Sequence, residues 1–477
     1  MREYLKFYVD GQWVDPLEAG STETINPATE EVSGKIALGG VSDVDRAVKA
    51  ARKAFDSWSQ TSRETRLALL DKINAEYEKR MADLGLAITE EMGAPAELAG
   101  GFHVALGAGH LGTAIESLKT FEFEQKMGAT MVRYEPIGVV GMITPWNWPI
   151  NQIAVKVFPA IAAGCTVVLK PSQEAHFSAQ IFAEIMEAAG VPAGVFNLIQ
   201  GRGSVVGAEL SRHPGVDMVS ITGSESAGIE VAKNAADTVK RVTQELGGKS
   251  ALIVLDDEQL AENVTKGVAG MMMNSGQTCS ATTRLLVPKA RMEEAMAAAK
   301  AGAESVTVGD PNSGVAMGPV VSKSQFNSIQ QYIEKGIAEG ATLVTGGPGR
   351  PEGLNKGWYV KPTVFANVTN DMVIAREEIF GPVQTILGYD DLDDAIAIAN
   401  DSDFGLAGGV YGLDLETCRN VARRMRTGWV SINDGFDFNC PFGGYKKSGN
   451  GREWGEFGFH EYLEIKGILG FEPAEEG

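Results

Sequence analysis

Gly138-Val-Val-Gly-Met-Ile-Thr144 is a short apolar run that predicts a buried β-strand. A helical stretch from Ile150 to Ala163 follows, and Thr166-Val-Val-Leu169 predicts the next strand. Short β-branched strands separated by helices are typical of a parallel sheet that is covered by helices on both faces. We therefore expect an α/β unit with a parallel sheet beginning near residue 137.

The alternation of strands and helices extends along most of the chain. Phe196–Ile199, Asp217–Ile221 and Arg241–Glu245 predict three more strands of the same sheet. After Gly247-Gly248 the pattern restarts, with a strand at Ala251–Leu255. We therefore expect a Rossmann-like domain followed by a second α/β domain, with a rigid cleft between them.

Two segments fit neither domain. Phe121–Glu124 and Ala129–Tyr134 alternate apolar and polar residues around Met127-Gly128, which predicts a hairpin, and Glu461–Ile465 alternates in the same way. Isolated strands of this kind have poor stability alone and need a partner. We therefore expect a small β oligomerisation arm and a homodimer or homotetramer.

Composition excludes several classes of protein. The chain has 42 Lys and Arg against 62 Asp and Glu, a formal net charge of −20, and no basic stripe, which argues against a nucleic-acid partner. The longest uncharged apolar stretch, Pro159–Leu169, is too short to span a membrane. Met1–Asp10 lacks a secretory apolar region, so we expect a cytoplasmic protein.

Cysteine and histidine spacing gives no sign of a metal site. The cysteines lie far apart without a CxxC pair, which disfavours a disulfide framework or structural zinc: Cys165, Cys279, Cys418 and Cys440. His103 and His110 lie seven residues apart on a predicted helix and could share a face, but nothing else supports a metal there. We expect no metal.

One cysteine stands on a predicted loop between a helix and a strand, in Asn274-Ser-Gly-Gln-Thr-Cys279-Ser. A free thiol has a pKa of about 8.5, so a nucleophilic Cys279 needs local stabilisation of its thiolate, which backbone N–H groups of the loop could supply. A free cysteine is also often a buried small apolar residue. Spacing alone leaves both interpretations open.

Two further groups stand where predicted strands end. In Thr144-Pro-Trp-Asn-Trp-Pro149 two prolines fix the backbone around Asn147, whose rigid amide is a donor of the kind that an oxyanion hole needs. Trp146 and Trp148 could instead be packing residues. Glu245 ends a strand before two glycines, a place that favours a functional group facing a cleft, although a solvated loop acid would look the same.

Polar residues at neighbouring strand ends favour a cofactor groove. Lys170-Pro-Ser172 offers a cation, and Thr222-Gly-Ser224 could present backbone N–H groups to a phosphate at a helix start. Gly201-Arg-Gly-Ser-Val-Val-Gly207 has one residue too many for the usual dinucleotide fingerprint. Because parallel strands end at one edge of the sheet, the three segments together favour a groove more than any one motif.

Taken together and in this order, these residues resemble the aldehyde dehydrogenase superfamily. The matching motifs are Pro145-Trp-Asn147, Leu169-Lys-Pro-Ser172, Ile221-Thr-Gly-Ser224, Glu245-Leu-Gly-Gly-Lys249, Gly276-Gln-Thr-Cys279, Glu377-Glu-Ile-Phe-Gly-Pro382 and Pro441-Phe-Gly-Gly-Tyr-Lys-Lys-Ser-Gly449. The resemblance covers essentially the whole chain. It implies an α/β fold with a Rossmann-like parallel-sheet cofactor domain, a second α/β catalytic domain and a small β oligomerisation arm.

The resemblance also implies oxidation of a small-molecule aldehyde to a carboxylic acid with NAD or NADP. On this basis Cys279 corresponds to the nucleophile, Glu245 to the general base, and Asn147 with the Cys279 backbone N–H to the oxyanion hole. The thiolate attacks the aldehyde to give a thiohemiacetal, hydride passes to the nicotinamide, and water activated by Glu245 hydrolyses the resulting thioester.

Cofactor and substrate residues follow from the resemblance position by position. Lys170 and Glu378 match positions at the cofactor's ribose groups, and Phe380 matches the aromatic residue at the nicotinamide end. The other residues expected in the cofactor groove are Ile143, Thr144, Pro145, Trp146, Ser172, Gln173, Gly203, Gly207, Thr222, Gly223, Ser224 and Leu246. The residues expected in the substrate tunnel are Trp148, Gln152, Val155, Thr278, Ser280 and Phe436.

Gln173 departs from the family pattern, because many NAD-preferring relatives carry a glutamate there that grips the adenine ribose. A carboxylate would repel a 2′-phosphate, whereas an amide would not, and Lys170 is close enough to attract one. We therefore expect NADP to be accepted alongside NAD. No arginine is clearly placed for a substrate carboxylate, which favours a plain aliphatic or aromatic aldehyde.

The expected domain boundaries are 1–117 with 137–247 for the NAD(P)-binding domain, 248–445 for the catalytic domain, and 118–136 with 446–477 for the arm. Three other functions compete. A CoA-acylating enzyme would not need Glu245 as a hydrolytic base, and a non-catalytic structural or binding relative would be expected to lack Cys279 or Glu245. A cofactor-independent thiol hydrolase would need a histidine partner near Cys279.

Overall fold

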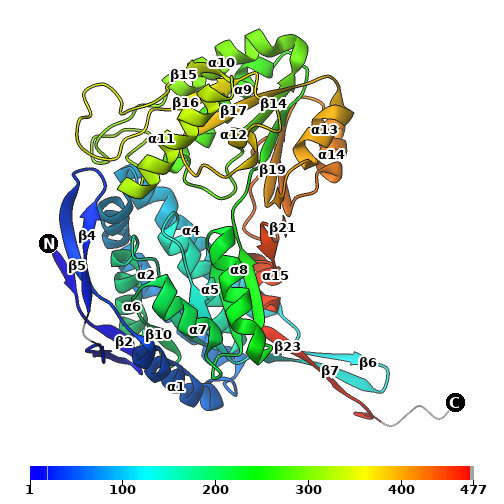
Figure 1. The fold of residues 1–477 in the computed structure, drawn as a ribbon. Coiled ribbons are helices and arrows are strands. Elements are labelled where there is room, and N and C mark those ends of the chain that lie inside the picture. Colours follow the sequence, from blue (N-terminus) through cyan, green and yellow to red (C-terminus); the bar gives the residue numbers. More distant parts are fainter. Residues whose placement is uncertain (19, 473–477) are drawn as a thin grey trace.

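The computed structural model describes residues 1–18 and 20–472 (Figure 1). Residue 19 and residues 473–477, the last part of the predicted arm, lie outside the described residues. The chain forms two α/β units and a three-stranded sheet that projects from the first unit (Figure 1). The predicted fold class is therefore confirmed. In the described part of the chain, no helix is both long enough and apolar enough to cross a membrane.

An eight-stranded sheet forms the centre of the first unit, and five of its strands run parallel in the order β12-β11-β8-β9-β10. These strands are β8 (Val139–Ile143), β9 (Thr166–Lys170), β10 (Phe196–Leu198), β11 (Met218–Thr222) and β12 (Arg241–Glu245). Antiparallel strands extend its two edges: β2 (Phe7–Val9), β3 (Gln12–Val14) and β22 (Gly449–Asn450). The chain runs outward from β8 through β9 and returns to its other side at β11, so a crevice is expected at their C-terminal ends.

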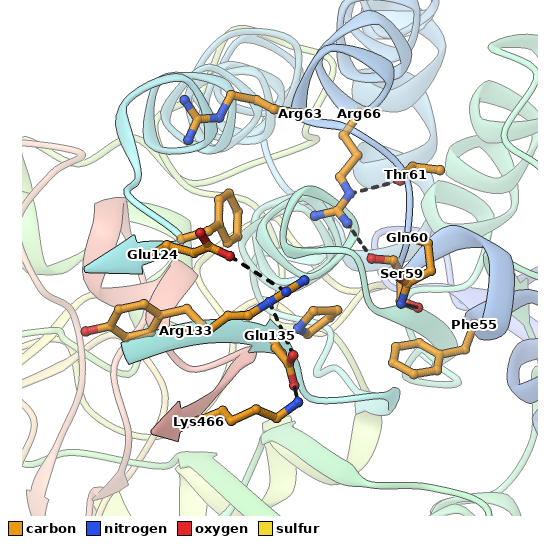
Figure 2. A pocket seen from close by; sticks show the side chains of 13 residues that line it. Phe55, Ser59, Gln60, Thr61, Arg63, Arg66, Glu124, Arg133, Glu135 and Lys466 are labelled. Atoms are coloured by element: carbon orange, nitrogen blue, oxygen red, sulfur yellow. Dashed lines mark hydrogen bonds and ion pairs between the residues drawn. The ribbon is translucent and has the colours of Figure 1, made fainter. Parts of the chain in front are cut away.

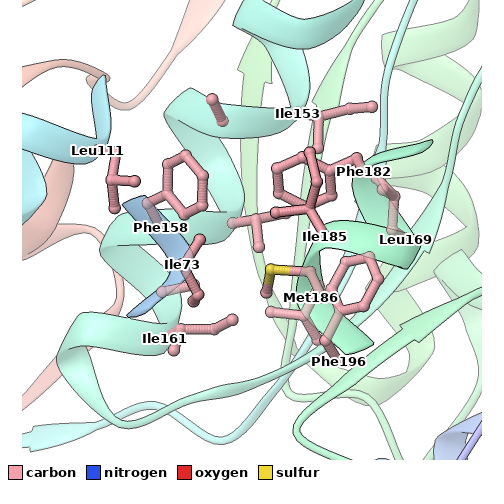
Figure 3. Packing of buried hydrophobic residues seen from close by; sticks show 14 of the residues in the cluster. Ile73, Leu111, Ile153, Phe158, Ile161, Leu169, Phe182, Ile185, Met186 and Phe196 are labelled. Carbon is pink, nitrogen blue, oxygen red and sulfur yellow. The ribbon is translucent and has the colours of Figure 1, made fainter. Parts of the chain in front are cut away.

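Helices cover both faces of this sheet. One face carries α2 (Arg63–Met92), α4 (Val104–Thr120), α5 (Pro149–Ala163) and α6 (Phe177–Ala188), and the other α1 (Val41–Trp58), α7 (Ala208–Arg212) and α8 (Glu225–Ala235). Figure 3 shows the first face, where Phe158 and Ile161 of α5 pack with Phe182 of α6. Every residue of α5 is buried, including its polar ones.

The ends of α5 follow from its sequence. Pro149 takes the first helical position, where a missing N–H costs nothing, and Gly164 ends the helix with a φ of 101°. Residues that the tunnel prediction places on this helix are therefore held in the interior of the first unit.

The second unit is built on a seven-stranded sheet that begins directly after β12. Its order is β15-β16-β17-β14-β13-β19-β20, and only β15 is antiparallel to its neighbour. The strands are β13 (Ala251–Val254), β14 (Arg284–Pro288), β15 (Thr342–Thr345), β16 (Thr363–Ala366), β17 (Val383–Tyr389), β19 (Ala407–Tyr411) and β20 (Trp429–Ile432). Its helices are α9 (Leu260–Met271), α10 (Met292–Glu304), α11 (Lys323–Ala338), α12 (Val373–Arg376), α13 (Leu392–Asn400) and α14 (Leu415–Arg424).

The segments that fitted neither domain pair with one another. β6 (Glu124–Met127) and β7 (Thr130–Pro136) form the predicted hairpin, and β23 (Leu463–Ile468) pairs antiparallel with β7 (Figure 1). Before reaching β23 the chain passes through β22, which pairs with β12, and α15 (Gly455–His460), which contacts α4 and α5. Residues 449–460, part of the predicted arm, thus lie against the first unit. A separate sheet holds β1 (Arg2–Tyr4), β4 (Ser21–Asn26) and β5 (Glu31–Ala37).

Candidate active site

A cavity of about 440 Å³ lies outside the C-terminal ends of β8, β9 and β11. Its lining contains these residues of the predicted site: Thr144, Pro145, Trp146, Asn147, Lys170, Ser172, Thr222, Gly223, Ser224, Leu246, Cys279, Glu378 and Phe380. Five lining residues were not expected: Gly247, Gln325, Ser328, Tyr332 and Ile379. Four residues predicted for the cofactor groove do not line it: Ile143, Gln173, Gly203 and Gly207.

The first-unit wall of this cavity suits a ligand rich in hydroxyl and phosphate groups. The hydroxyls of Thr144 and Thr222 are buried and have no hydrogen-bond partner within the described chain. Ser224 caps α8, so the N-terminus of this eleven-residue helix opens at the cavity wall. Lys170 Nζ donates to the Pro171 carbonyl at 2.8 Å, and burial lowers its pKa to about 8. These features fit a dinucleotide cofactor.

The opposite wall comes from the second unit. Gln325, near the start of α11, donates from its side-chain amide to the carbonyls of Ile379 at 3.1 Å and Phe380 at 2.9 Å. These bonds hold Phe380 at a φ of 57°, a left-handed conformation that bulky residues rarely adopt. The Phe380 ring then meets Trp146 edge to face, with centroids 5.4 Å apart.

Glu378 lies at the junction between the two units. It accepts a hydrogen bond from the Gly248 backbone N–H at 3.0 Å. Burial raises the pKa of Glu378 to about 7, opposed by that hydrogen bond and by the charge of Lys249. Its neighbour Glu377 points elsewhere and accepts from the Tyr332 hydroxyl at 2.7 Å.

The loop before Cys279 has a rare backbone. Asn274, Ser275 and Gly276 all have left-handed φ values, of 55°, 58° and 68°. A left-handed conformation costs about 1 to 2 kcal/mol for a residue other than glycine, so this turn needs support from its surroundings. Ser275 supplies part of it by donating to the Gly318 carbonyl at 2.9 Å. Gly276 indicated a tight loop, whereas three left-handed residues in a row could not be read from the sequence.

Buried amides connect this turn to Asn147. Asn147 Nδ2 donates to the Gln277 carbonyl at 3.2 Å, and Asn274 Nδ2 donates to the Asn147 carbonyl at 2.8 Å. The Gln277 side chain is itself held, because its Oε1 accepts from the Val321 N–H at 2.9 Å. Asn147 and Cys279 line the same cavity.

The Cys279 thiol is surrounded by groups that disfavour its thiolate. Burial raises the pKa of Cys279 well above its ordinary value, and the charges of Glu378 and Glu245 raise it further. A hydrogen bond from the Ser280 backbone acts in the opposite direction and is outweighed. The backbone N–H groups expected to stabilise the thiolate are therefore outweighed by burial and by the nearby acids.

Glu245 does not line this cavity, but its charge reaches the Cys279 thiol. It is buried at the end of β12, and neither carboxylate oxygen has a hydrogen-bond partner within the described chain. Burial raises the pKa of Glu245 well above 4.5, Glu453 raises it further, and Lys156 opposes the shift. Lys156 of α5 forms a buried ion pair with Glu453 and donates to Ser220 Oγ at 3.2 Å. Sequence reasoning missed this pair, although a lone charge in an apolar helix was a signal.

The predicted tunnel residues separate into two groups. A cavity of about 320 Å³ on the second unit is lined by Thr278, Ser280 and Phe436. The others lie at the start of α5 and are buried: Trp148, Gln152 and Val155. The groups are linked by one hydrogen bond, because Trp148 Nε1 donates to Thr278 Oγ1 at 3.0 Å.

An aromatic cluster lies next to Cys279. Cys279 packs against a small core that includes Phe442, and Phe442 stacks on Trp454 with centroids 5.0 Å apart. Phe436 meets Phe438 and Trp454 edge to face, at 5.1 and 5.5 Å. Cys279 thus lines the cavity and also packs against an apolar region.

The two histidines considered for a metal are used otherwise. His103 stacks on Trp148 with centroids 4.1 Å apart, and His110 Nε2 lies 2.7 Å from Asn151 Oδ1. Among residues 1–18 and 20–472, no cluster of three or more His, Cys, Asp or Glu side chains is arranged to hold a metal ion.

A larger cavity, of about 510 Å³, lies at the base of the arm (Figure 2). Its positive charge is already engaged. Arg66 donates to the Ala163 carbonyl at 2.9 Å, and Arg133 pairs with Glu124 at 3.7 Å and Glu135 at 3.3 Å. Volume alone is therefore a poor guide to the site.

Comparison with known proteins identifies the family. Residues 13–468 match the aldehyde dehydrogenase family. A 3-succinoylsemialdehyde-pyridine dehydrogenase of a Pseudomonas species is 53% identical over 477 residues, which cover 99% of this chain and 100% of that protein. A cysteine-to-alanine mutant of aldehyde dehydrogenase C from Pseudomonas syringae, solved with NAD+ and octanal, has a TM-score of 0.98 and 51% identity, covering 98% of this chain and 97% of its own.

The Mycobacterium tuberculosis aldehyde dehydrogenase solved with NAD+ has a TM-score of 0.96 and 40% identity, covering 100% of this chain and 99% of its own. These matches confirm the predicted family and the predicted NAD(P)-dependent oxidation of an aldehyde. The competing CoA-acylating and non-catalytic interpretations are not favoured. The chain belongs to the aldehyde dehydrogenase family and is an NAD(P)-dependent oxidoreductase.

Proposed function

We propose that Cys279, Glu245 and Asn147 carry out the oxidation in the roles of nucleophile, base and oxyanion donor. The observation that carries this proposal is the position of Cys279. Cys279 lines one cavity with Asn147 and most of the expected cofactor residues, while the charge of the buried Glu245 acts on its thiol. Cofactor binding is assigned to the cavity residues named above, with Lys170 and Glu378 at the ribose groups.

The steps follow from these positions. Cys279 Sγ bonds to the aldehyde carbon as the thiol proton passes to Glu245, and the substrate oxygen, as an oxyanion, accepts hydrogen bonds from Asn147 Nδ2 and the Cys279 N–H. NAD or NADP, when bound, supplies the acceptor for the hydride that leaves this carbon. Glu245 releases the thiol proton to solvent and then takes a proton from the water that attacks the thioester. It returns this proton to the leaving sulfur, so the thiol re-forms as the acid leaves.

Two variants separate acylation from hydrolysis. We expect Cys279→Ala to produce no NADH, because no covalent adduct can form. Glu245→Gln should release at most one equivalent of NADH per active site in a stopped-flow experiment, because the thiol proton and the proton of the hydrolytic water both lose their acceptor. Steady-state turnover of Glu245→Gln at the wild-type rate would refute the assignment of Glu245.

We propose that NADP is accepted alongside NAD, because Gln173 brings no carboxylate to the adenine ribose. Its neighbour Ser172 and the cation of Lys170 both line the cavity. Replacing Gln173 with Glu should then lower kcat/KM for NADP and leave NAD comparatively unaffected. An NADP efficiency at least about a thousand-fold below that of NAD in the wild type would refute dual use.

For the substrate we propose an uncharged aliphatic or aromatic aldehyde. The support is the aromatic cluster next to Cys279 and the apolar lining of a cavity of about 400 Å³ that includes Phe436, Phe442 and Trp454. A series of straight-chain aldehydes should show KM falling as the chain lengthens, since each buried CH₂ contributes about 0.8 kcal/mol. A preference for an aldehyde acid over its uncharged analogue would contradict the proposal.

We also propose the domain division given above, with residues 449–460 moved from the arm to the NAD(P)-binding domain, and assembly through the arm into a homodimer or homotetramer. Met127 and Ile465 on the arm are each about two-thirds exposed, at 67% and 68%. Analytical ultracentrifugation of Ile465→Lys against the wild type tests this, and an unchanged mass would exclude that contact. The four free cysteines support a reducing compartment, so we propose a cytoplasmic location.

A further inference from the structure

The side chain of Asn274 is buried and donates hydrogen bonds to the backbone carbonyls of two other residues. Asn274 is 1% exposed, and its Nδ2 donates to the Asn147 carbonyl at 2.8 Å and to the Gln277 carbonyl at 3.3 Å. Asn147 Nδ2 reaches the same Gln277 carbonyl at 3.2 Å. The Gln277 carbonyl oxygen thus accepts hydrogen bonds from the side-chain amides of both Asn147 and Asn274. The Asn274 amide also donates to the backbone carbonyl of Asn147.

This arrangement fixes the direction of the Asn147 amide. A primary amide is planar and carries two N–H bonds, so anchoring one of them sets where the other points. The first N–H of Asn147 is anchored on Gln277, and Asn147 lines the cavity that contains Cys279. The second N–H is left for an oxygen of the ligand in that cavity.

We propose that Asn274 is a positioning residue that aims the Asn147 amide at the oxyanion. Asn274 does so by donating to the Asn147 backbone carbonyl and to the Gln277 carbonyl, which also accepts the hydrogen bond from the Asn147 amide. The proposal rests on the proposed role of Asn147. It adds that the left-handed turn before Cys279 exists to bring the Asn274 side chain under Asn147.

The residue type at this position follows from two demands. The left-handed φ of 55° favours glycine, asparagine or aspartate. Donation to two carbonyls requires an amide, because glycine has no side chain and an aspartate would place an acceptor against two acceptors. Asparagine is the residue that meets both demands.

A double-mutant cycle on the full-length enzyme tests the proposal. The variants are Asn274→Gly, which suits the left-handed backbone but removes the amide, Asn147→Ala, and the pair combined. We expect Asn147→Ala to lower kcat by about a hundred- to a thousand-fold, as loss of one oxyanion donor does elsewhere. Asn274→Gly should lower kcat by about ten- to a hundred-fold and change KM for NAD by less than about threefold, because only the orientation of the Asn147 amide is lost.

The kcat of the double variant decides whether Asn274 acts through Asn147. If Asn274 acts through Asn147, the pair should match Asn147→Ala to within about threefold. If the two losses multiply, or if Asn274→Gly keeps its kcat within about threefold of wild type, the positioning role is overturned. If Asn147→Ala itself keeps wild-type turnover, the proposed role of Asn147 fails, and that result is separable because it needs no change at Asn274.

Two further variants remove the effect of folding from the result. Asn274→Asp keeps the size and the left-handed preference but not the donors, so it should lose as much kcat as Asn274→Gly, and retention of kcat would overturn the proposal. Asn367→Gly is the matched control. Asn367 is an exposed asparagine with a left-handed φ of 52° that bonds Thr342 at 3.1 Å, and its loss should leave kcat unchanged. A loss of kcat with Asn367→Gly equal to that with Asn274→Gly would assign the effect to the backbone.

Discussion

Gly248 offers a direct measure of how closely the catalytic loop is held. A Cβ atom at this position would lie 2.6 Å from the Cys279 carbonyl oxygen and 3.3 Å from Leu406 Cβ. The nearest obstacle is backbone, which cannot turn aside as the end of a flexible side chain can. Gly248→Ala must therefore push the Cys279 carbonyl back by about 0.8 Å to restore an ordinary contact of 3.4 Å.

The size of that displacement sets the expected loss. Misplacing reacting groups by about 1 Å costs about a hundred-fold in rate, so Gly248→Ala should lower kcat by about ten- to a hundred-fold. Steady-state kinetics with one aldehyde and saturating NAD measure it, and thermal unfolding shows whether the fold survives.

The control is Gly112→Ala in α4. A Cβ there meets nothing within 4 Å, and alanine is favoured over glycine in a helix by about 1 kcal/mol. We expect an unchanged kcat and a slightly higher Tm. A Gly248→Ala enzyme with kcat within about threefold of wild type and an unchanged Tm would refute the reasoning, because the loop would then have room to move.

Three more predictions concern charge. Because burial raises the pKa of Glu378 to about 7, its carboxylate is lost as the pH falls through that value; KM for NAD should rise there, and a Glu378→Gln enzyme should show no such rise. Arg284 is 1% exposed and donates hydrogen bonds to several backbone carbonyls. Arg284→Leu should therefore lower the free energy of unfolding, measured with urea, by about 3 to 5 kcal/mol. A loss below about 1 kcal/mol would contradict this prediction. Removing a nearby negative charge with Glu245→Gln should lower the pKa of Cys279, so iodoacetamide should alkylate the thiol at lower pH than in the wild type.

The strand ends could be read from the sequence because the physics of a parallel sheet is local and repetitive. Thr144, Lys170 and Thr222 each end a short apolar run, and a parallel sheet must bring such ends to one edge. All three line one cavity. The hairpin at Gly128 was equally accessible, since alternation on both sides of a glycine has few other solutions.

Contributions from distant segments could not be read in this way. Gln325 reaches the cavity from a helix of the second unit, and its bond to the Phe380 carbonyl has no local signature. Lys156 finds its partner Glu453 across 297 positions of the chain. Each of these contacts depends on how the two units and the C-terminal segment meet, and that relation is not contained in any one periodic segment.

In the proposed mechanism, Cys279 and Glu245 act as a coupled pair. Burial raises the pKa of both Cys279 and Glu245, so neither loses a proton to water easily. Moving the proton from Cys279 to Glu245 creates no new net charge in the buried site. The cost of forming the thiolate therefore depends on the difference between the two raised values and not on either one alone. In the proposed mechanism, a carboxyl with an ordinary pKa would be a poorer acceptor for the thiol proton than the buried Glu245.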